Sequence, residues 1–162
     1  MKEALDSFAR LPALSAPPRQ IVVFKLRGRV FGVDVGCVRE IRGWQPTTEL
    51  PHAPNYVLGV VNLRGAIVPV FDLQARLGFG PNDDAAAGVV IVVEIGDRFV
   101  GFLSDSVSDI IDICEEDLRA APDYADGHRP LLRGLAVKSD DIIGLLDLDA
   151  VIDVSCLATL DS

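Results

Sequence analysis

The chain has 162 residues, of which 49% are hydrophobic and 24% are charged, and its formal net charge is −9. This composition is typical of a globular protein and excludes an intrinsically disordered chain. The acidic net charge argues against non-specific binding to nucleic acid or to an anionic membrane surface. A chain of this length forms one domain or two small joined units, and it can bury roughly 70% of its unfolded surface.

Short apolar runs rich in β-branched residues predict strands along most of the chain. The expected strands are residues 21–26, 29–35, 38–42, 57–63, 66–71, 89–95, 98–104, 107–113, 135–138 and 142–146. Helices are expected to be short: one at 72–77 with Asp72 as its N-cap, one at 115–121 that ends before Pro122, and a C-terminal helix from Asp147. Residues 78–88 have the composition of a linker.

No targeting or membrane segment is expected. The first 20 residues combine charges with three prolines and lack the apolar stretch of a secretion signal. No apolar run is long enough for a membrane span, so direct membrane insertion is not expected. The cysteines Cys37, Cys114 and Cys156 are too few and too far apart for a disulfide framework, which favours a cytoplasmic location. We interpret Cys37 as a buried structural thiol, because its neighbours are apolar.

The most informative segment is VVNLRGAIVPVFDL, residues 60–73. Two apolar runs flank Arg64-Gly65, and Gly65 supplies a turn because a residue without Cβ reaches positive φ at little cost. Pro69 cannot donate to a β-ladder, so its strand is predicted to be an edge strand or to be locally bulged. Arg64 at the turn could serve recognition or could simply be solvated, and the local pattern alone favours the second interpretation.

The chain contains an internal repeat. Residues 21–41 align with 90–110 at a shift of 69 positions, and residues 67–73 align with 142–148 at a shift of 75. The first alignment matches Arg29 with Arg98, Gly32 with Gly101, Val38 with Val107, Glu40 with Asp109 and Ile41 with Ile110. Because several elements recur in the same order, we predict two similar small β-barrels that pack on each other through an apolar interface.

No catalytic or metal-binding constellation is apparent. The two histidines, His52 and His128, lie in separate loop-like segments without metal-ligand spacing. Nucleophile elbows, phosphate-binding loops and dinucleotide fingerprints are absent from the sequence. The acidic clusters read as solvated turns and caps. We therefore expect a protein that is not an enzyme and that uses no metal or cofactor.

The chain resembles the CheW family of bacterial chemotaxis coupling proteins. The resemblance covers about residues 20–155. It is carried by VREIRGW (38–44), LPHAPNYVLGVVNLRGAIVPVFDLQARLG (50–78), residues 89–111, EEDLRAAP (115–122) and IIGLLDLDAVI (142–152). It implies two SH3-like five-stranded barrels, one about 20–84 and the other about 85–155, with some strand exchange between them. Residues 1–19 and 156–162 would be tails.

The resemblance also implies partners. Proteins of this family bridge a CheA-type histidine kinase, through its regulatory domain, and the cytoplasmic tips of methyl-accepting receptors. By position, Glu40 and Arg64 match family residues important for assembly. The other positions that match residues implicated in partner contacts are Val35, Val38, Gly59, Val89, Val107 and Ile110.

Two interpretations stay open for these residues. The apolar ones could line a groove for receptor helices or could belong to a barrel core. Glu40 and Arg64 could pair with each other or present their charges to a partner. The same module could also serve twitching motility or another chemosensory pathway, and a small-ligand barrel or an enzyme is the third alternative.

Overall fold

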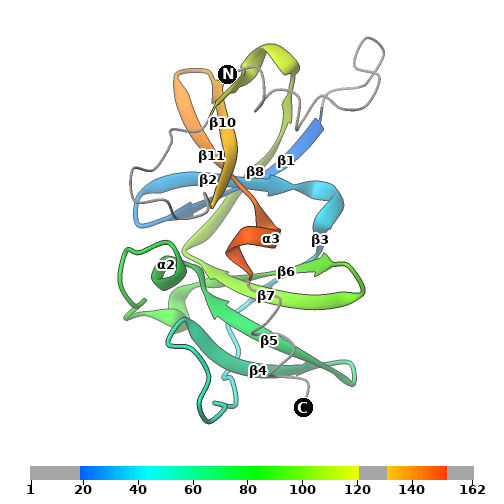
Figure 1. Ribbon diagram of the computed structural model, residues 1–162, viewed down its shortest axis with the longest axis vertical. Helices are drawn as coiled ribbons and strands as arrows, with labels where there is room; N and C mark the ends of the chain where they lie inside the picture. The colour runs from blue at the N-terminus through cyan, green and yellow to red at the C-terminus, as the bar shows by residue number, and fades with distance from the viewer. Residues whose placement is uncertain (1–18, 121–130, 153–162) are drawn as a thin grey trace.

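The computed structural model describes residues 19–120 and 131–152, and these residues form two β-sheets with short helical turns (Figure 1). The six-stranded sheet contains β1 (Arg19–Leu26), β2 (Arg29–Asp34), β8 (Ser106–Ile113), β9 (Leu118–Arg119), β10 (Leu132–Lys138) and β11 (Asp141–Leu146). The five-stranded sheet contains β3 (Val38–Gly43), β4 (Val57–Leu63), β5 (Ala66–Asp72), β6 (Val89–Ile95) and β7 (Arg98–Ser104). The predicted mainly β fold is confirmed.

The strand order shows that the sheets follow one plan. The order is β8-β1-β2-β11-β10-β9 in one sheet and β3-β6-β7-β5-β4 in the other. By the internal repeat, the first five strands in the first order correspond one by one to the five strands in the second. Each sheet therefore combines the first hairpin of one half of the chain with later strands of the other half. A boundary near residue 84 therefore does not separate the sheets, because strands are exchanged between the halves.

The six-stranded sheet differs from the predicted five strands by β9. Leu118 and Arg119 pair with Ala136 and Leu135 of β10. The residues predicted as a helix at 115–121 instead form a 3-10 turn, η3 (Glu115–Asp117), followed by β9. Leu118 is buried against the sheet, and this tertiary pairing outweighs the local helical preference. The five-stranded sheet has a smaller counterpart, an isolated bridge between Thr48 and Val60.

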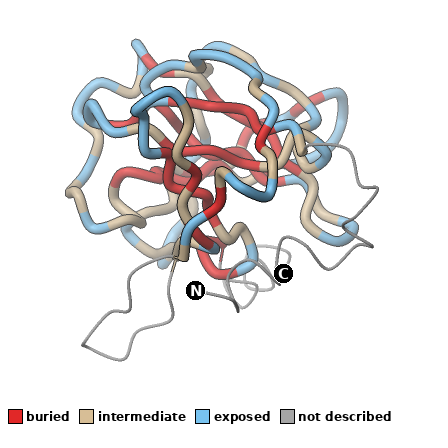
Figure 2. Tube along the Cα trace, turned by 90° about the horizontal axis from the view of Figure 1, so that it is seen from above, coloured by how far each residue is buried: buried red, intermediate tan, exposed pale blue. Residues whose placement is uncertain are grey.

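The two sheets share one apolar core. Its buried cluster combines Phe24 of β1 with Phe102 of β7, whose ring centroids lie 5.5 Å apart. Val151 and Ile152, at the end of α3 (Leu148–Val151), belong to the same cluster. Figure 2 shows buried backbone through the middle of the molecule and exposed segments around it. The expected apolar interface between the repeats is therefore present, and it holds the sheets together.

The short helices begin as predicted. Asp72 accepts a hydrogen bond from the Ala75 amide at the start of α2 (Leu73–Arg76), and Asp147 accepts one from Ala150 at the start of α3. Both bonds measure 3.3 Å. The predicted extension of the C-terminal helix beyond Ile152 lies outside the described residues, as do residues 1–18, 121–130 and 153–162.

Residues 78–88 form an anchored loop, in contrast to the linker that their composition predicts. The buried Gln74 side chain donates to the carbonyls of Gly80 and Pro81 at 3.2 and 3.0 Å. The Asn82 amide donates to Asp72 at 2.9 Å. The loop also contains a 3-10 turn, η2 (Ala85–Ala87). Side chains of the preceding helix therefore fix this glycine-rich segment.

Candidate functional site

The hairpin of β4 and β5 carries Arg64 at a tight two-residue turn. Arg64 and Gly65 have φ angles of 52° and 89°, and they connect the paired residues Leu63 and Ala66. Two consecutive positive φ angles are typical of the type I′ turn, whose twist suits a β-hairpin. The Asn62 side chain accepts a hydrogen bond of 2.9 Å from the Gly65 amide. The turn is thus confirmed, and it holds the Arg64 backbone in place.

Pro69 lies in an interior strand, so of the two predicted alternatives the edge strand is wrong, whereas the β4–β5 ladder does contain a bulge close to Pro69. β5 pairs with β4 on one side and with β7 on the other. The ladder to β7 involves residues from Val70 onward, and the register shift in β4 lies between Val57 and Gly59. Opposite Pro69, the Val60 amide and carbonyl both bond Thr48 and therefore point away from β5. The missing N–H of the proline costs neither ladder a hydrogen bond.

Glu40 of β3 connects two arginines. One carboxylate oxygen contacts Nη2 of Arg64, and the other lies 3.6 Å from Nη1 of Arg42. The Arg64 side chain is 77% exposed, whereas that of Glu40 is 25% exposed. Since β3 and β4 are the two edge strands of the five-stranded sheet, the ion pair joins opposite edges. The sheet therefore curves until its ends approach, as expected for a barrel-like unit.

β3 runs from the charged cluster toward the junction between the sheets, with a bulge between Val38 and Glu40 that breaks the alternation of faces. Val38, Val35 and Val107 pack against the core that both sheets share. Val35 lies in a 3-10 turn, η1 (Val35–Cys37), and not at the end of a strand as predicted, because the Asp34 side chain caps that turn.

The structure places the remaining predicted residues elsewhere. Gly59 is buried with a φ of 136°, and a Cβ there would lie 2.8 Å from the Thr48 carbonyl carbon. This close approach gives Gly59 a packing role. Val89 begins β6, where its carbonyl accepts a bond from Ser104, and Ile110 is 51% exposed on β8. Neither residue belongs to the shared core cluster.

Sequence reasoning missed the exposure of two isoleucines that lie close in sequence to the charged pair. Ile41 follows Glu40 on β3, and Ile67 lies three residues after Arg64; they are 42% and 65% exposed. Their repeat counterparts, Ile110 and Ile142, are 51% and 62% exposed. The alignment of the two halves already pairs these isoleucines, and treating such pairs as equivalent surface positions would have found them.

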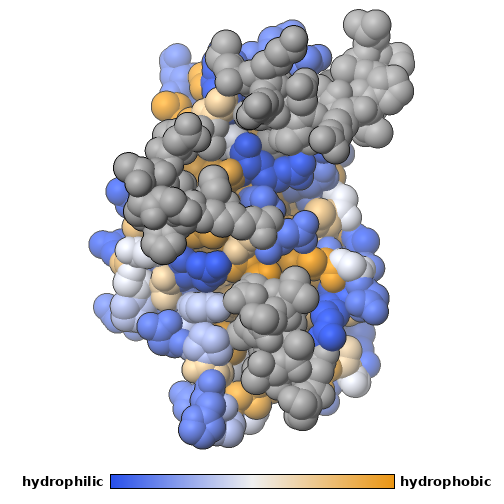
Figure 3. Space-filling view, viewed as in Figure 1, coloured by the Kyte–Doolittle hydropathy of each residue, from blue (hydrophilic) through white to orange (hydrophobic). Residues whose placement is uncertain are grey.

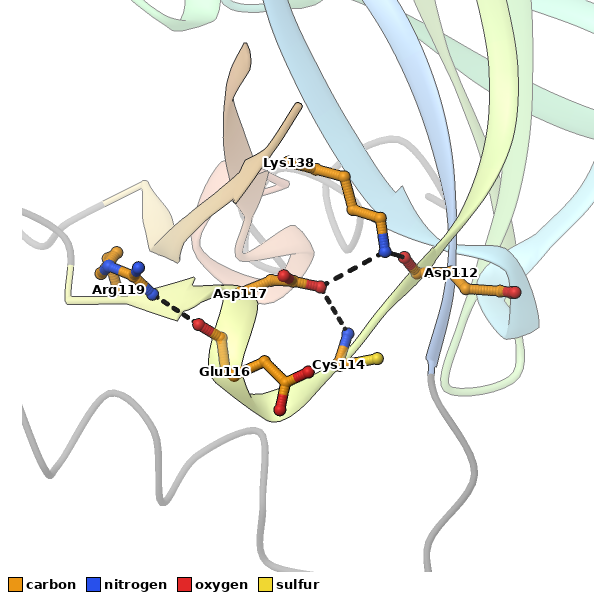
Figure 4. A network of polar contacts seen from close by, with 6 residues as sticks. All are labelled: Asp112, Cys114, Glu116, Asp117, Arg119 and Lys138. Carbon is orange, nitrogen blue, oxygen red and sulfur yellow. Dashed lines mark hydrogen bonds and ion pairs between the residues drawn. The ribbon is translucent and has the colours of Figure 1, made fainter. Parts of the chain in front are cut away.

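In the six-stranded sheet, Lys138 occupies the place next to the corresponding turn (Figure 4). Its Nζ donates to the Asp112 carbonyl at 2.7 Å and lies 3.5 Å from Oδ2 of Asp117. Asp117 also accepts a bond of 2.9 Å from the Cys114 amide. The turn residue that matches Arg64 is Ser139. In this sheet the cross-sheet contact is therefore made by a lysine at the end of the strand before the turn, and not by an arginine in the turn itself.

Within the described part of the chain, no group of histidine, cysteine or acidic side chains could hold a metal ion. Burial raises the pKa of the Cys37 thiol, and Asp34 raises it further. A raised pKa opposes thiolate formation, although Cys37 is only partly buried and not fully buried as predicted. Among the described residues, no helix is long and apolar enough to cross a membrane.

An exposed arginine that is paired across the sheet, together with exposed isoleucines on the same sheet, suits a protein-interaction module. Comparisons with known proteins give the family. The CheW-like domain family matches residues 20–156. The chemotaxis protein CheW of Rhizobium meliloti is 43% identical over 134 residues, which cover 82% of this chain and 86% of that protein. The probable chemotaxis protein CheW of Rhizobium etli is 41% identical over 140 residues, with coverages of 86% and 90%.

The fold agrees with this similarity. The crystal structure of the scaffolding protein TtCheW from Thermoanaerobacter tengcongensis matches with a TM-score of 0.78 at 31% identity, covering 86% of this chain and 95% of that chain. The chain belongs to the CheW family of chemotaxis scaffold proteins. It is therefore a non-catalytic adaptor whose partners are components of a chemotaxis signalling complex.

Proposed function

We propose that this chain couples methyl-accepting chemoreceptors to a CheA-type histidine kinase by binding the kinase regulatory domain and the cytoplasmic receptor tips. Family membership supports the role. The observation that carries the proposal for this chain is the Glu40–Arg64 ion pair, whose arginine side chain is 77% exposed at the hairpin turn. The role places the protein in the cytoplasm, held near the membrane through receptor contacts.

The charged turn suits contact with the kinase. Arg64 is 77% exposed on a backbone fixed by its turn, so its guanidinium loses little conformational freedom on binding. Arginine also donates several hydrogen bonds in a fixed geometry. Ile41 and Ile67, which lie close in sequence to Glu40 and Arg64, are exposed as well. Exposed apolar side chains and charges are both used in protein interfaces.

The sheet junction suits a helical receptor segment. Val35, Val38 and Val107 are only partly buried where they pack against the shared core. On the face shown in Figure 3, hydrophobic residues lie at the level where the sheets meet, and hydrophilic residues border them. A helix places an apolar stripe into such a surface through residues spaced three and four apart. Coupling then requires that the receptor contacts differ between its signalling states.

Titration calorimetry against the regulatory domain of a CheA-type kinase from the same organism tests the kinase contact. We expect saturable binding by the unchanged protein and about tenfold weaker binding by Arg64→Ala, since an interface arginine that loses its contacts costs on the order of 1–2 kcal/mol. Arg119→Ala is the matched control, because Arg119, among the described residues, donates through its Nη1 to the nearby carbonyls of Glu116 and Leu118.

The proposal fails if the folded, unchanged protein shows no binding at high micromolar concentrations. It also loses its assignment of the site if Arg64→Ala and Arg119→Ala bind equally well. Melting curves of all three proteins are measured in parallel, and they should coincide, because both arginines are exposed and contribute little to stability.

A further inference from the structure

The helix α3 is too short to be stable by its own hydrogen bonds. It spans Leu148–Val151, a single turn, and helices of this length do not persist without outside support. Asp147 caps its N-terminal end. The last two residues of the helix, Ala150 and Val151, and the following Ile152 are buried. Figure 1 shows α3 between the two sheets, so whatever holds this helix also affects their junction.

Arg76 supports the opposite end of α3. This residue is the last of α2, about half the chain away in sequence. Its Nε donates to the Val151 carbonyl at 2.7 Å, and its Nη2 donates to the Ala150 carbonyl at 2.9 Å. The guanidinium also lies 5.3 Å from the centre of the Tyr56 ring. The last carbonyls of a helix lack partners within the helix and carry its negative dipole end, so a forked cation suits them well.

The equivalent helix of the other half ends in a different way. α2 continues into Gly78, whose φ is 88°, and the amides of Gly78 and Phe79 bond back to carbonyls of Ala75 and Gln74. A glycine of this kind satisfies the carbonyls of its own helix. At a shift of 75 positions, the residues matching Gly78 and Arg76 are Asp153 and Val151. The repeat thus gives α3 neither of these two residues, and Arg76 of α2 bonds its last two carbonyls instead.

We propose that Arg76 is a positioning residue that fastens α3 in the junction of the sheets and so keeps the two sheets in a defined relative position. Apolar packing of Val151 and Ile152 would hold the helix near the core, but packing has no directional preference. The two hydrogen bonds from one guanidinium fix both the end and the orientation of α3. The consequence for coupling rests on the proposed function, because receptor contacts at the junction need that fixed geometry.

Hydrogen exchange of the isolated, full-length chain tests the fastening directly. The amides of Ala150 and Val151 bond the Asp147 carbonyl, and that of Ile152 bonds the Leu148 carbonyl, so they report opening of α3. In Arg76→Ala we expect these amides to exchange about tenfold faster, while amides of β6 change less than about twofold. Arg76→Lys should lie between, because an ammonium cannot reproduce the fork.

Arg39→Ala is the matched control. Arg39 is another arginine with side-chain hydrogen bonds, and it pairs with Glu94 at 2.6 Å, but both residues belong to the five-stranded sheet. Its loss should leave exchange at Ala150, Val151 and Ile152 unchanged. Unchanged exchange of these amides in Arg76→Ala would overturn the proposal. Equal acceleration at α3 and β6 would overturn it too, since Arg76 would then stabilise the whole fold and not this helix.

A second measurement separates positioning from general stability. With the regulatory domain of the kinase, Arg76→Ala should keep its affinity within about twofold, whereas receptor-dependent kinase activation falls about fivefold. Equal activation by the unchanged and variant proteins would contradict the positioning role. If the unchanged protein does not bind the kinase at all, the proposed function fails, but the exchange experiment still decides whether Arg76 fastens α3.

Discussion

The two sheets share one plan, yet their hairpins reach across each sheet by different contacts. In the five-stranded sheet, Arg64 in the turn between β4 and β5 pairs with Glu40 of β3, and the arginine side chain is 77% exposed. In the six-stranded sheet, Lys138 behind the turn reaches the Asp112 carbonyl and Asp117, and the lysine side chain is 38% exposed. A more buried contact is less screened by water and contributes more to stability.

This difference separates stability from recognition within one repeated fold. A mostly exposed ion pair adds little to the free energy of folding, so its arginine is available to a partner at small cost. The Lys138 contact is more enclosed and also involves a backbone carbonyl. We therefore expect the five-stranded sheet to present the charged contact surface, whereas the corresponding place of the six-stranded sheet serves mainly to hold strands together.

The largest expected effect concerns a register shift in a strand pair that both sheets share. Each has a register shift at the equivalent place, between Val57 and Gly59 and between Leu132 and Gly134. Gly59→Ala should destabilise the protein by about 3 kcal/mol, because alanine disfavours a φ of 136° and its Cβ would overlap the Thr48 backbone. Urea unfolding monitored by circular dichroism measures this change.

Gly43→Ala is the control for this substitution. A Cβ at Gly43 would meet no atom within 4 Å, and its φ is not in the left-handed region. The stability of this variant should stay within about 0.5 kcal/mol of the unchanged protein. Equal effects of the two substitutions would show that the close approach of the Thr48 backbone is not the reason for a glycine at position 59.

An intermediate effect is expected for the lysine of the six-stranded sheet. Lys138→Ala should lower the free energy of unfolding by about 1 kcal/mol, since it removes a charged hydrogen bond to the Asp112 carbonyl and leaves Asp117 with one partner fewer. Arg64→Ala should lower it by less than about 0.5 kcal/mol. Urea unfolding of both variants at low salt gives the comparison, and a larger loss for Arg64→Ala would reverse our assignment of the sheets.

The smallest effect concerns Cys37, in the turn that contacts both β1 and β6. Burial holds the pKa of this thiol above its ordinary value of 9.0, so the unfolded chain loses its proton first as the pH rises. The thiol therefore favours the folded state below pH 9.0, and this contribution is lost at higher pH. Stability measured between pH 7 and 10.5 should fall slightly more in the unchanged protein than in Cys37→Ala. Identical pH profiles would contradict this.

Local chemistry explains why much of the fold could be predicted from the sequence. Positive-φ turns need particular residues, and Gly65 therefore marks the hairpin of β4 and β5. Carboxylates that can cap helices mark the starts of α2 and α3, at Asp72 and Asp147. The repeat revealed two equivalent units, because matching elements recur in the same order. Each of these signals lies within a few residues of the structure that it specifies.

Contacts between distant segments could not be predicted in this way. β9 forms because Leu118 finds a buried place beside β10, and no local pattern distinguishes this from a helical turn. The contact of Arg76 with α3 depends on the exchange of strands, which places the two short helices close together. The pairing of Glu40 with Arg64 was one of two open alternatives, because it requires the curvature of the whole sheet.

The most direct test of this account measures stability and kinase binding for Arg64→Ala and Lys138→Ala side by side. We predict opposite outcomes: Arg64→Ala binds the kinase regulatory domain about tenfold more weakly with an unchanged melting temperature, and Lys138→Ala melts at a lower temperature with unchanged affinity. If both variants lose stability and affinity together, or if Arg64→Ala binds normally, the division of roles between the two sheets is wrong.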